Sequence, residues 1–211
     1  MSKAIYICYR NKTFTEGIDK RLFEICNQIT PDNVTVKRKS KIHIKDDIAY
    51  AITRPNGVIY ESGSSVILGF LYEQTDIEWD KPKQTYPDGN YVMFRNVEDK
   101  LEVVGDFAGS RTIWYYHDNE IFIASTSQRA IVLFLGSFSF DERIIPWVLS
   151  TGSLGPLYSW DERIHRLQSG SSVLLSKNSW ELSVANRSVI FSAEKRRTEE
   201  HKKLLTTSIR N

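Results

Sequence analysis

Few residues in this chain have the types and spacing that catalysis or metal binding requires. The histidines are far apart and have no cysteine or carboxylate at metal-ligand spacing beside them, so no metal site is expected. These histidines are His43, His117, His165 and His201. A Ser-His-Asp triad stays open, although the chain has no G-x-S-x-G motif. Asp106 and Arg111 flank a Phe-Ala-Gly turn, and a structural ion pair holding this turn is favoured over a catalytic pair.

The composition is that of an ordinary globular protein. The chain has 211 residues, of which 41% are hydrophobic and 26% charged, and its formal net charge is +2. Nucleic-acid-binding proteins usually carry a concentrated basic face, so no nucleic-acid partner is expected. No apolar run approaches the ~20 residues that span a bilayer, and the N-terminus lacks the features of a signal peptide. Cys8 and Cys26 are expected to be buried free thiols, and the chain a cytoplasmic protein without a membrane partner.

Short apolar and alternating runs predict many β-strands. Ala4–Tyr9 is an apolar, aromatic run typical of a buried first strand. Further strands are predicted at Val34/Val36, Ile42/Ile44, Ile48/Tyr50/Ile52, Tyr91–Arg95, Leu101–Asp106, Thr112–His117 and Glu120–Ser125. Ser172–Ser176 and Trp180–Ala185 are predicted to pair as a late hairpin. Turns or loops are expected at Pro55-Asn56-Gly57, Thr75–Lys83 and Asp118-Asn119.

Helical periodicity predicts the remaining elements. A capping box at Thr13–Glu16 introduces an apolar helix face that ends at Ile29. Further helices are predicted at Ser65–Glu73, at Ser127–Leu135, at Asp141–Ser150 with an interruption at Pro146, and in the tail Ala193–Arg210. Strands, then helices, then strands without regular βαβ alternation indicate an α+β fold with antiparallel sheets.

Four segments occur in an order that resembles one known family. They are Pro87–Phe94, Gly105–Tyr116, Glu120–Ile131 and Arg163–Gly170. Their order and spacing resemble the N-terminal, class II glutamine amidotransferase domain of the asparagine synthetase family. The resemblance covers residues 85–176 well and the first 75 residues loosely.

The resemblance implies a fold and a division of the chain. The family domain is an αββα N-terminal-nucleophile hydrolase-like sandwich of two antiparallel sheets flanked by helices. Residues 1–192 would then be the amidotransferase-like domain, and residues 193–211 a linker helix leading to a missing synthetase domain. In the family that domain carries an S-G-G-x-D-S pyrophosphate loop, where ATP activates a carboxylate as an acyl-adenylate. ATP and Mg are therefore implied for the missing half, and no cofactor for this chain.

The positions that would hold and cleave glutamine differ from the family pattern. Ser2 stands at the position of the nucleophilic cysteine, whose own α-amine serves as base once Met is removed, and Lys3 replaces the adjacent glycine. Gly63 replaces the aspartate that binds the glutamine amine, and the arginine that holds the carboxylate has no counterpart. Asn56-Gly57 is similar to the oxyanion element but lies too close to the next motif, so a plain turn is favoured. We therefore expect Ser2 to be inactive and the chain to hold no catalytic residue.

The resulting hypothesis is a non-catalytic, glutaminase-like domain or subunit of an ATP-dependent, asparagine-synthetase-like amide-bond-forming enzyme. Relatives that lost the cysteine include β-lactam synthetases and lasso-peptide macrolactam cyclases, so macrolactam or peptide-natural-product formation is implied. The partner would be a synthetase domain or subunit, and the substrate a peptide or small acid. Two alternatives stay open: an active N-terminal-nucleophile amidohydrolase that uses Ser2, and a stand-alone protein-binding module.

Overall fold

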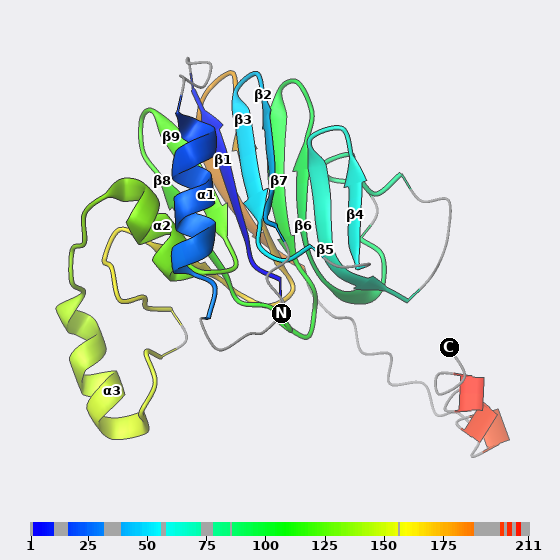
Figure 1. The fold of residues 1–211 in the computed structure, drawn as a ribbon. Helices are drawn as coiled ribbons and strands as arrows, with labels where there is room; N and C mark the ends of the chain where they lie inside the picture. The colour runs from blue at the N-terminus through cyan, green and yellow to red at the C-terminus, as the bar shows by residue number, and fades with distance from the viewer. Residues whose placement is uncertain are drawn as a thin grey trace.

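Two antiparallel six-stranded sheets form the body of the protein (Figure 1). The computed structural model describes residues 2–10, 17–31, 39–55, 58–72, 78–84, 86–155, 157–187, 199–200, 202–203 and 206–207. The first sheet, sheet A, has the order β10-β8-β9-β1-β3-β2, and the second, sheet B, the order β12-β11-β7-β6-β5-β4. Every pairing within the two sheets is antiparallel, as the α+β expectation requires.

The strand bounds agree with most of the sequence predictions. Sheet A contains β1 (Ala4–Tyr9), β2 (Lys41–Lys45), β3 (Ile48–Ile52), β8 (Ile113–His117), β9 (Ile121–Ser125) and β10 (His165–Leu167). Sheet B contains β4 (Ile59–Ser62), β5 (Ser65–Leu71), β6 (Gly89–Asn96), β7 (Lys100–Gly105), β11 (Ser171–Ser176) and β12 (Glu181–Asn186). The late hairpin is confirmed as the β11–β12 pair, and the Asp118-Asn119 turn joins β8 to β9.

The alternation of side chains along β1 places this strand between two hydrophobic cores. Tyr6 points toward sheet B, where its ring stacks on Phe94 with centroids 5.2 Å apart and on Tyr50 of β3 at 5.6 Å. Ile5 and Ile7 point to the opposite face and pack in a second core with the helices. Successive side chains of a strand alternate between its two faces, and each face of β1 packs in one of the two cores, so both faces are buried.

Two helices cover the outer face of sheet A (Figure 1). Helix α1 (Ile18–Gln28) buries Leu22 and Ile25, as the predicted apolar face requires. Helix α2 (Gln128–Leu135) buries Ala130, Ile131 and Phe134 against the same core. The predicted capping box at Thr13–Glu16 lies outside the described residues.

A loop covers the outer face of sheet B where the sandwich prediction placed helices. Trp79 and Tyr86 pack against buried residues of β5, β6 and β7 on this face. The buried ion pair Arg95–Glu102, 3.3 Å long, also lies here, and Glu102 accepts a 2.8 Å hydrogen bond from the Tyr86 hydroxyl. Among the described residues, α1 and α2 both pack on sheet A, and the expected helical layer on sheet B is not confirmed.

The predicted helix at Ser65–Glu73 is wrong, since residues 65–71 form strand β5. This strand lies between β4 and β6 and is buried on both faces, so its apolar run lacks the alternation that marks a half-exposed strand. A side chain at Gly69 would collide with the β6 backbone, because its Cβ would lie 2.0 Å from the Asn90 carbonyl oxygen. The run therefore forms a strand in close contact with its neighbour.

The helical segment after sheet A differs slightly from its prediction. It consists of a 3-10 turn, η1 (Glu142–Ile144), followed by α3 (Ile145–Thr151), with Asp141 accepting a 3.1 Å hydrogen bond from the Arg143 amide. Pro146 lies in the first turn of α3 and so does not interrupt it, because a first-turn residue needs no amide donor. Figure 1 shows α3 extending away from the two sheets.

Several predictions fall largely outside the described residues. The Val34/Val36 strand does so entirely, as do Asn56 and Gly57 of the predicted turn. In the tail, residues 199–200, 202–203 and 206–207 are described and are helical. In the predicted loop Thr75–Lys83, residues 78–83 are described and contain neither helix nor strand.

Candidate functional site

The start of β1 brings Ser2 together with the turn that the sequence singled out. The Ser2 side chain is 5% exposed, and its hydroxyl donates a 2.8 Å hydrogen bond to the Arg54 carbonyl. The Ser2 carbonyl accepts a 3.1 Å hydrogen bond from the Arg111 guanidinium. Residue 2 precedes β1, which lies between β3 and β9 in sheet A, and its hydrogen bonds join it to Arg54, after β3, and to Arg111, before β8.

Hydroxyl groups fasten this end of β1 on both sides. The Lys3 amide donates to Thr53 at 2.9 Å, and the Ala4 amide donates to Thr126 at 3.0 Å. The Ser125 hydroxyl donates to the Ala4 carbonyl at 2.6 Å. These hydrogen bonds hold the backbone from Ser2 to Ala4 in place. We call the group made of Ser2, Arg54, Arg111 and the hydroxyls of Thr53, Ser125 and Thr126 the closed region.

Lys3 has a structural role in the closed region. Its ammonium donates a 3.0 Å hydrogen bond to the Ile29 carbonyl, just beyond the C-terminal end of α1. A cation is favourable there because the helix dipole leaves partial negative charge on the last carbonyls. The side chain at the family's glycine position therefore binds a helix end.

Asp106 and Arg111 are not an ion pair, contrary to the prediction. The buried Asp106 carboxylate accepts hydrogen bonds from the amides of Tyr91, at 3.0 Å, and Ser110, at 3.2 Å, and from the Ser110 hydroxyl. No ion pair within 4 Å joins it to Arg111, and both residues are described. The carboxylate thus holds the turn through amide and hydroxyl donors, while Arg111 reaches across to Ser2.

Burial weakens the charged form of Arg111. Desolvation lowers the pKa of its guanidinium, and the negative charge of Asp106 partly opposes this effect. Its Nε is buried and has no hydrogen-bond partner among the described residues. The interaction with the Ser2 carbonyl is therefore its main polar contact in the closed region.

The contacts of Ser2 are unsuited to nucleophilic catalysis. A serine hydroxyl becomes a nucleophile when a neighbouring base accepts its proton. Here the hydroxyl donates to a backbone carbonyl, no described histidine or carboxylate is bonded to it, and with Met1 attached the Ser2 nitrogen is a peptide amide and not a basic amine. The arrangement holds the backbone and leaves the hydroxyl unactivated.

The other expected positions do not join Ser2. Gly63 lies in the β4–β5 turn with φ 57°, and the adjacent Ser64 carbonyl accepts a 2.6 Å hydrogen bond from the Tyr6 hydroxyl. That contact reaches β1 at its third residue and not at its start. The Asn56-Gly57 element lies outside the described residues.

The remaining reactive groups serve packing. His43 stacks on Tyr50, His117 packs between Phe122 and Trp180, and His165 packs on Tyr115. Burial lowers the pKa of His117. His201 lies outside the described residues. No group of histidine, cysteine and carboxylate side chains suited to a metal occurs within the described ranges.

The two cysteines are buried free thiols, as predicted. Burial raises the pKa of Cys8, and the neighbouring Asp47 carboxylate raises it further. Burial also raises the pKa of Cys26. Neither thiol is therefore a nucleophile near neutral pH, since the thiolate is the reactive form.

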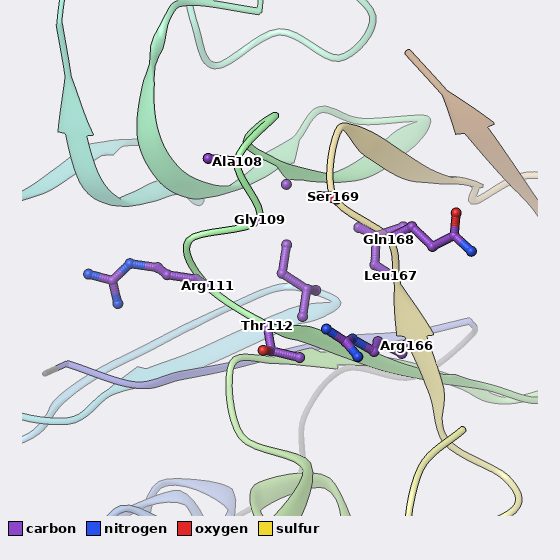
Figure 2. Close-up of a pocket in the computed structure, with 10 residues that line it drawn as sticks. Ala108, Gly109, Arg111, Thr112, Arg166, Leu167, Gln168 and Ser169 are labelled. Atoms are coloured by element: carbon purple, nitrogen blue, oxygen red, sulfur yellow. The ribbon is translucent and has the colours of Figure 1, made fainter. Parts of the chain in front are cut away.

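A small polar cavity of about 140 Å³ opens beside the same turn (Figure 2). The residues around it come from the 105–113 segment and from the end of β10 with the turn after it. Figure 2 shows the Thr112 and Arg166 side chains close together, while the Arg111 side chain points away from them. The sequence drew attention to both segments, but it assigned no role to Thr112 or Arg166.

Among the described residues, no helix is both long and apolar enough to cross a bilayer. The sequence matches no protein-family model and no curated protein. Among solved structures, the chain is similar to a glutamine phosphoribosylpyrophosphate amidotransferase from B. subtilis complexed with ADP and GMP, with 11% sequence identity and a TM-score of 0.42. The similarity covers 87% of this chain and 42% of that one, so the chain spans less than half of that enzyme. At this identity and TM-score the similarity assigns neither a family nor a function.

Proposed function

We propose that residues 1–192 form a glutaminase-like domain of N-terminal-nucleophile hydrolase ancestry that has lost glutaminase chemistry. Residues 193–211 would be the linker helix to a synthetase domain, on the same chain or on a separate subunit. The observation that carries the proposal is the state of Ser2, which is 5% exposed and donates its hydroxyl to the Arg54 carbonyl.

The position of Ser2 supports the ancestry. In the family that the motifs resemble, the nucleophile is the residue that follows the initiator Met. In this structure the residue at that position lies two residues before β1, an inner strand of one of two packed antiparallel sheets. Arg111, from the motif segment 105–116, binds its carbonyl. The motif segment and the second residue are therefore in direct contact.

The contacts around Ser2 support the loss of activity. Its hydroxyl has a carbonyl acceptor and no side-chain base among the described residues, and the Lys3 side chain extends from the family's glycine position to the end of α1. Gly63 supplies no carboxylate to hold an ammonium group. A domain built in this way is a scaffold that would support acyl-adenylate formation in its partner.

The partner would use ATP and Mg to activate a carboxylate, and an amine of the substrate itself would replace ammonia from glutamine. A peptide or small acid would be the substrate, and a macrolactam or another amide the product. The test combines this chain with the protein that carries the pyrophosphate loop, ATP, Mg and candidate acids. We expect AMP and pyrophosphate without added glutamine, and a strict requirement for glutamine would contradict the proposal.

An active amidohydrolase that uses Ser2 is the second candidate, because Ser2 lies where the family nucleophile would lie. It requires removal of Met1, which frees the Ser2 amine to act as base. The intact mass of the purified chain decides this point. A mass that includes Met1 rules the second candidate out, whereas a Ser2-linked adduct with an amide-mimicking electrophile would favour it over the scaffold.

A further inference from the structure

Two adjoining cavities share Thr112 and Arg166 in their walls. The smaller is the polar cavity of about 140 Å³ beside the 105–113 segment. The larger, of about 440 Å³, lies between the edge of sheet A and the α3 segment. A volume of about 300–1,000 Å³ is typical of small-ligand sites, so the larger cavity alone has room for a ligand.

The cation at the boundary of the two cavities is unpaired. Arg166 is exposed, and no hydrogen bond or ion pair holds its side chain among the described residues. Two neighbouring arginines differ in this respect: Arg143 pairs with Asp141 at 2.7 Å, and Arg163 pairs with Asp161 at 2.7 Å. Neither cavity is lined by an aspartate or a glutamate. Arg166 is therefore available to an anion from solution.

The wall of the larger cavity is aromatic. Trp114 of β8 and Trp147 of α3 face it together with Leu154. Gly155 allows the Trp147 indole to pack closely, since a Cβ at this residue would lie 2.8 Å from the indole Cδ2. The Gly155 φ of 80° is also one that residues with side chains rarely adopt. The shape of this wall therefore depends on a residue without a side chain.

We propose that the two cavities form one binding site for a carboxylate attached to an apolar body, either a small free acid or the C-terminus of a peptide. Arg166 would bind the carboxylate through its two parallel N–H donors, with the Thr112 hydroxyl as an additional donor. The apolar body would lie against Trp114 and Trp147. Arg111 also borders the smaller cavity, but its guanidinium donates to the Ser2 carbonyl and its side chain points away from Arg166 (Figure 2). One unpaired guanidinium and one hydroxyl suit a monoanion, whereas a phosphate dianion is usually held by several cations. This site is independent of the proposed function.

The test compares acids with their neutral amides as probes. The small pair is 4-phenylbutyrate and 4-phenylbutyramide, and the peptide pair is one phenylalanine-terminated peptide with a free or an amidated C-terminus. Binding is followed through the tryptophan indole resonances in nitrogen–proton correlation spectra. We expect the acid of at least one pair to bind about tenfold more tightly than its amide, because a charge-assisted hydrogen bond is lost in the amide. The pair that shows this preference identifies the source of the carboxylate.

Two sets of variants separate the charge from the apolar wall. Arg166→Gln is expected to remove the preference for the acid, while Arg129→Gln, at an exposed arginine outside both cavities, should keep it. Trp147→Ala is expected to weaken acid and amide alike, and Trp160→Ala, at an exposed tryptophan outside both cavities, should weaken neither. Circular dichroism checks that each variant is folded.

Three results would overturn the proposal: no indole shift with any probe, equal binding of acid and amide, or a preference that survives Arg166→Gln. None of these results bears on glutamine hydrolysis. Failure of this site and failure of the proposed function are therefore distinguishable.

Discussion

The closed region around Ser2 and the open cavities around Arg166 both take residues from the segment that joins β7 to β8. At the closed region Arg111 binds the Ser2 carbonyl, and the Ser2 hydroxyl already has an acceptor. At the open cavities Thr112, the next residue, lies beside an arginine without a protein partner. At the position expected for a nucleophile, the Ser2 hydroxyl and the Arg111 guanidinium are bonded to backbone carbonyls. One residue farther along the chain, Thr112 borders the cavities that contain Arg166 of β10, which is unpaired among the described residues. This difference indicates that the two regions can be altered separately.

The largest effect is expected from Asp106→Ala, which should disrupt both regions at once. Asp106 is 2% exposed and holds the turn through the amides of Tyr91 and Ser110. Leaving these donors without an acceptor should lower the free energy of unfolding by about 3 kcal/mol. Urea denaturation measures the loss. Asp106→Asn keeps an acceptor and should cost less, and Asp99→Ala, at an exposed site, should cost almost nothing; equal losses for Asp99→Ala and Asp106→Ala would contradict this role.

A smaller effect is expected from Arg111→Met, which removes a hydrogen bond of the closed region at a residue that also borders the smaller cavity. The variant removes the donor to the Ser2 carbonyl but keeps the apolar part of a half-buried side chain. The free energy of unfolding should fall by about 1–2 kcal/mol, as for a lost hydrogen bond to a charged group. The preference of the cavities for an acid over its amide should stay unchanged. A loss of that preference would show that the two regions are one.

Ser2→Ala should have a smaller effect still. It removes one hydrogen bond, from the Ser2 hydroxyl to the Arg54 carbonyl, and should lower the free energy of unfolding by about 1 kcal/mol. Thermal unfolding followed by circular dichroism measures this change. An unchanged midpoint would show that the hydroxyl contributes nothing to the closed region.

The smallest effect on stability is expected from Arg166→Gln. An exposed side chain without a protein partner should change the free energy of unfolding by less than about 0.5 kcal/mol. The same urea experiment measures it, with Arg163→Gln as the matched control at an arginine bonded to Asp161 and Ser137. Comparable losses at both positions would mean that Arg166 has a structural role.

Local patterns predicted most of the sheets. The runs at Ala4–Tyr9 and Ile48–Ile52 form neighbouring strands, and the four consecutive strands from β6 to β9 follow as expected. The short strands β4 and β10 were not predicted. Strand β5 was predicted as a helix, since the apolar run in Ser65–Leu71 is buried on both faces and gives no period that separates strand from helix. Which outer face the helices cover was not predictable either, because it depends on contacts between distant segments.

The site could be predicted only in part. The sequence singled out Ser2 and Arg111 as separate residues. The hydrogen bond between them joins positions 109 residues apart, so no local sequence pattern encodes it. The ion pair expected between Asp106 and Arg111 failed because nearby amides satisfy the carboxylate. The sequence did not indicate a role for Arg166, because only the folded structure shows that its side chain has no protein partner in the part of the chain that is described.

The most direct test of the central claim is release of ammonia and glutamate from glutamine by the purified chain. We predict no release above the buffer rate for the wild-type protein, and the same result for Ser2→Ala. Release by the wild-type protein that Ser2→Ala abolishes would contradict the account, because it would show that the Ser2 hydroxyl acts as a nucleophile.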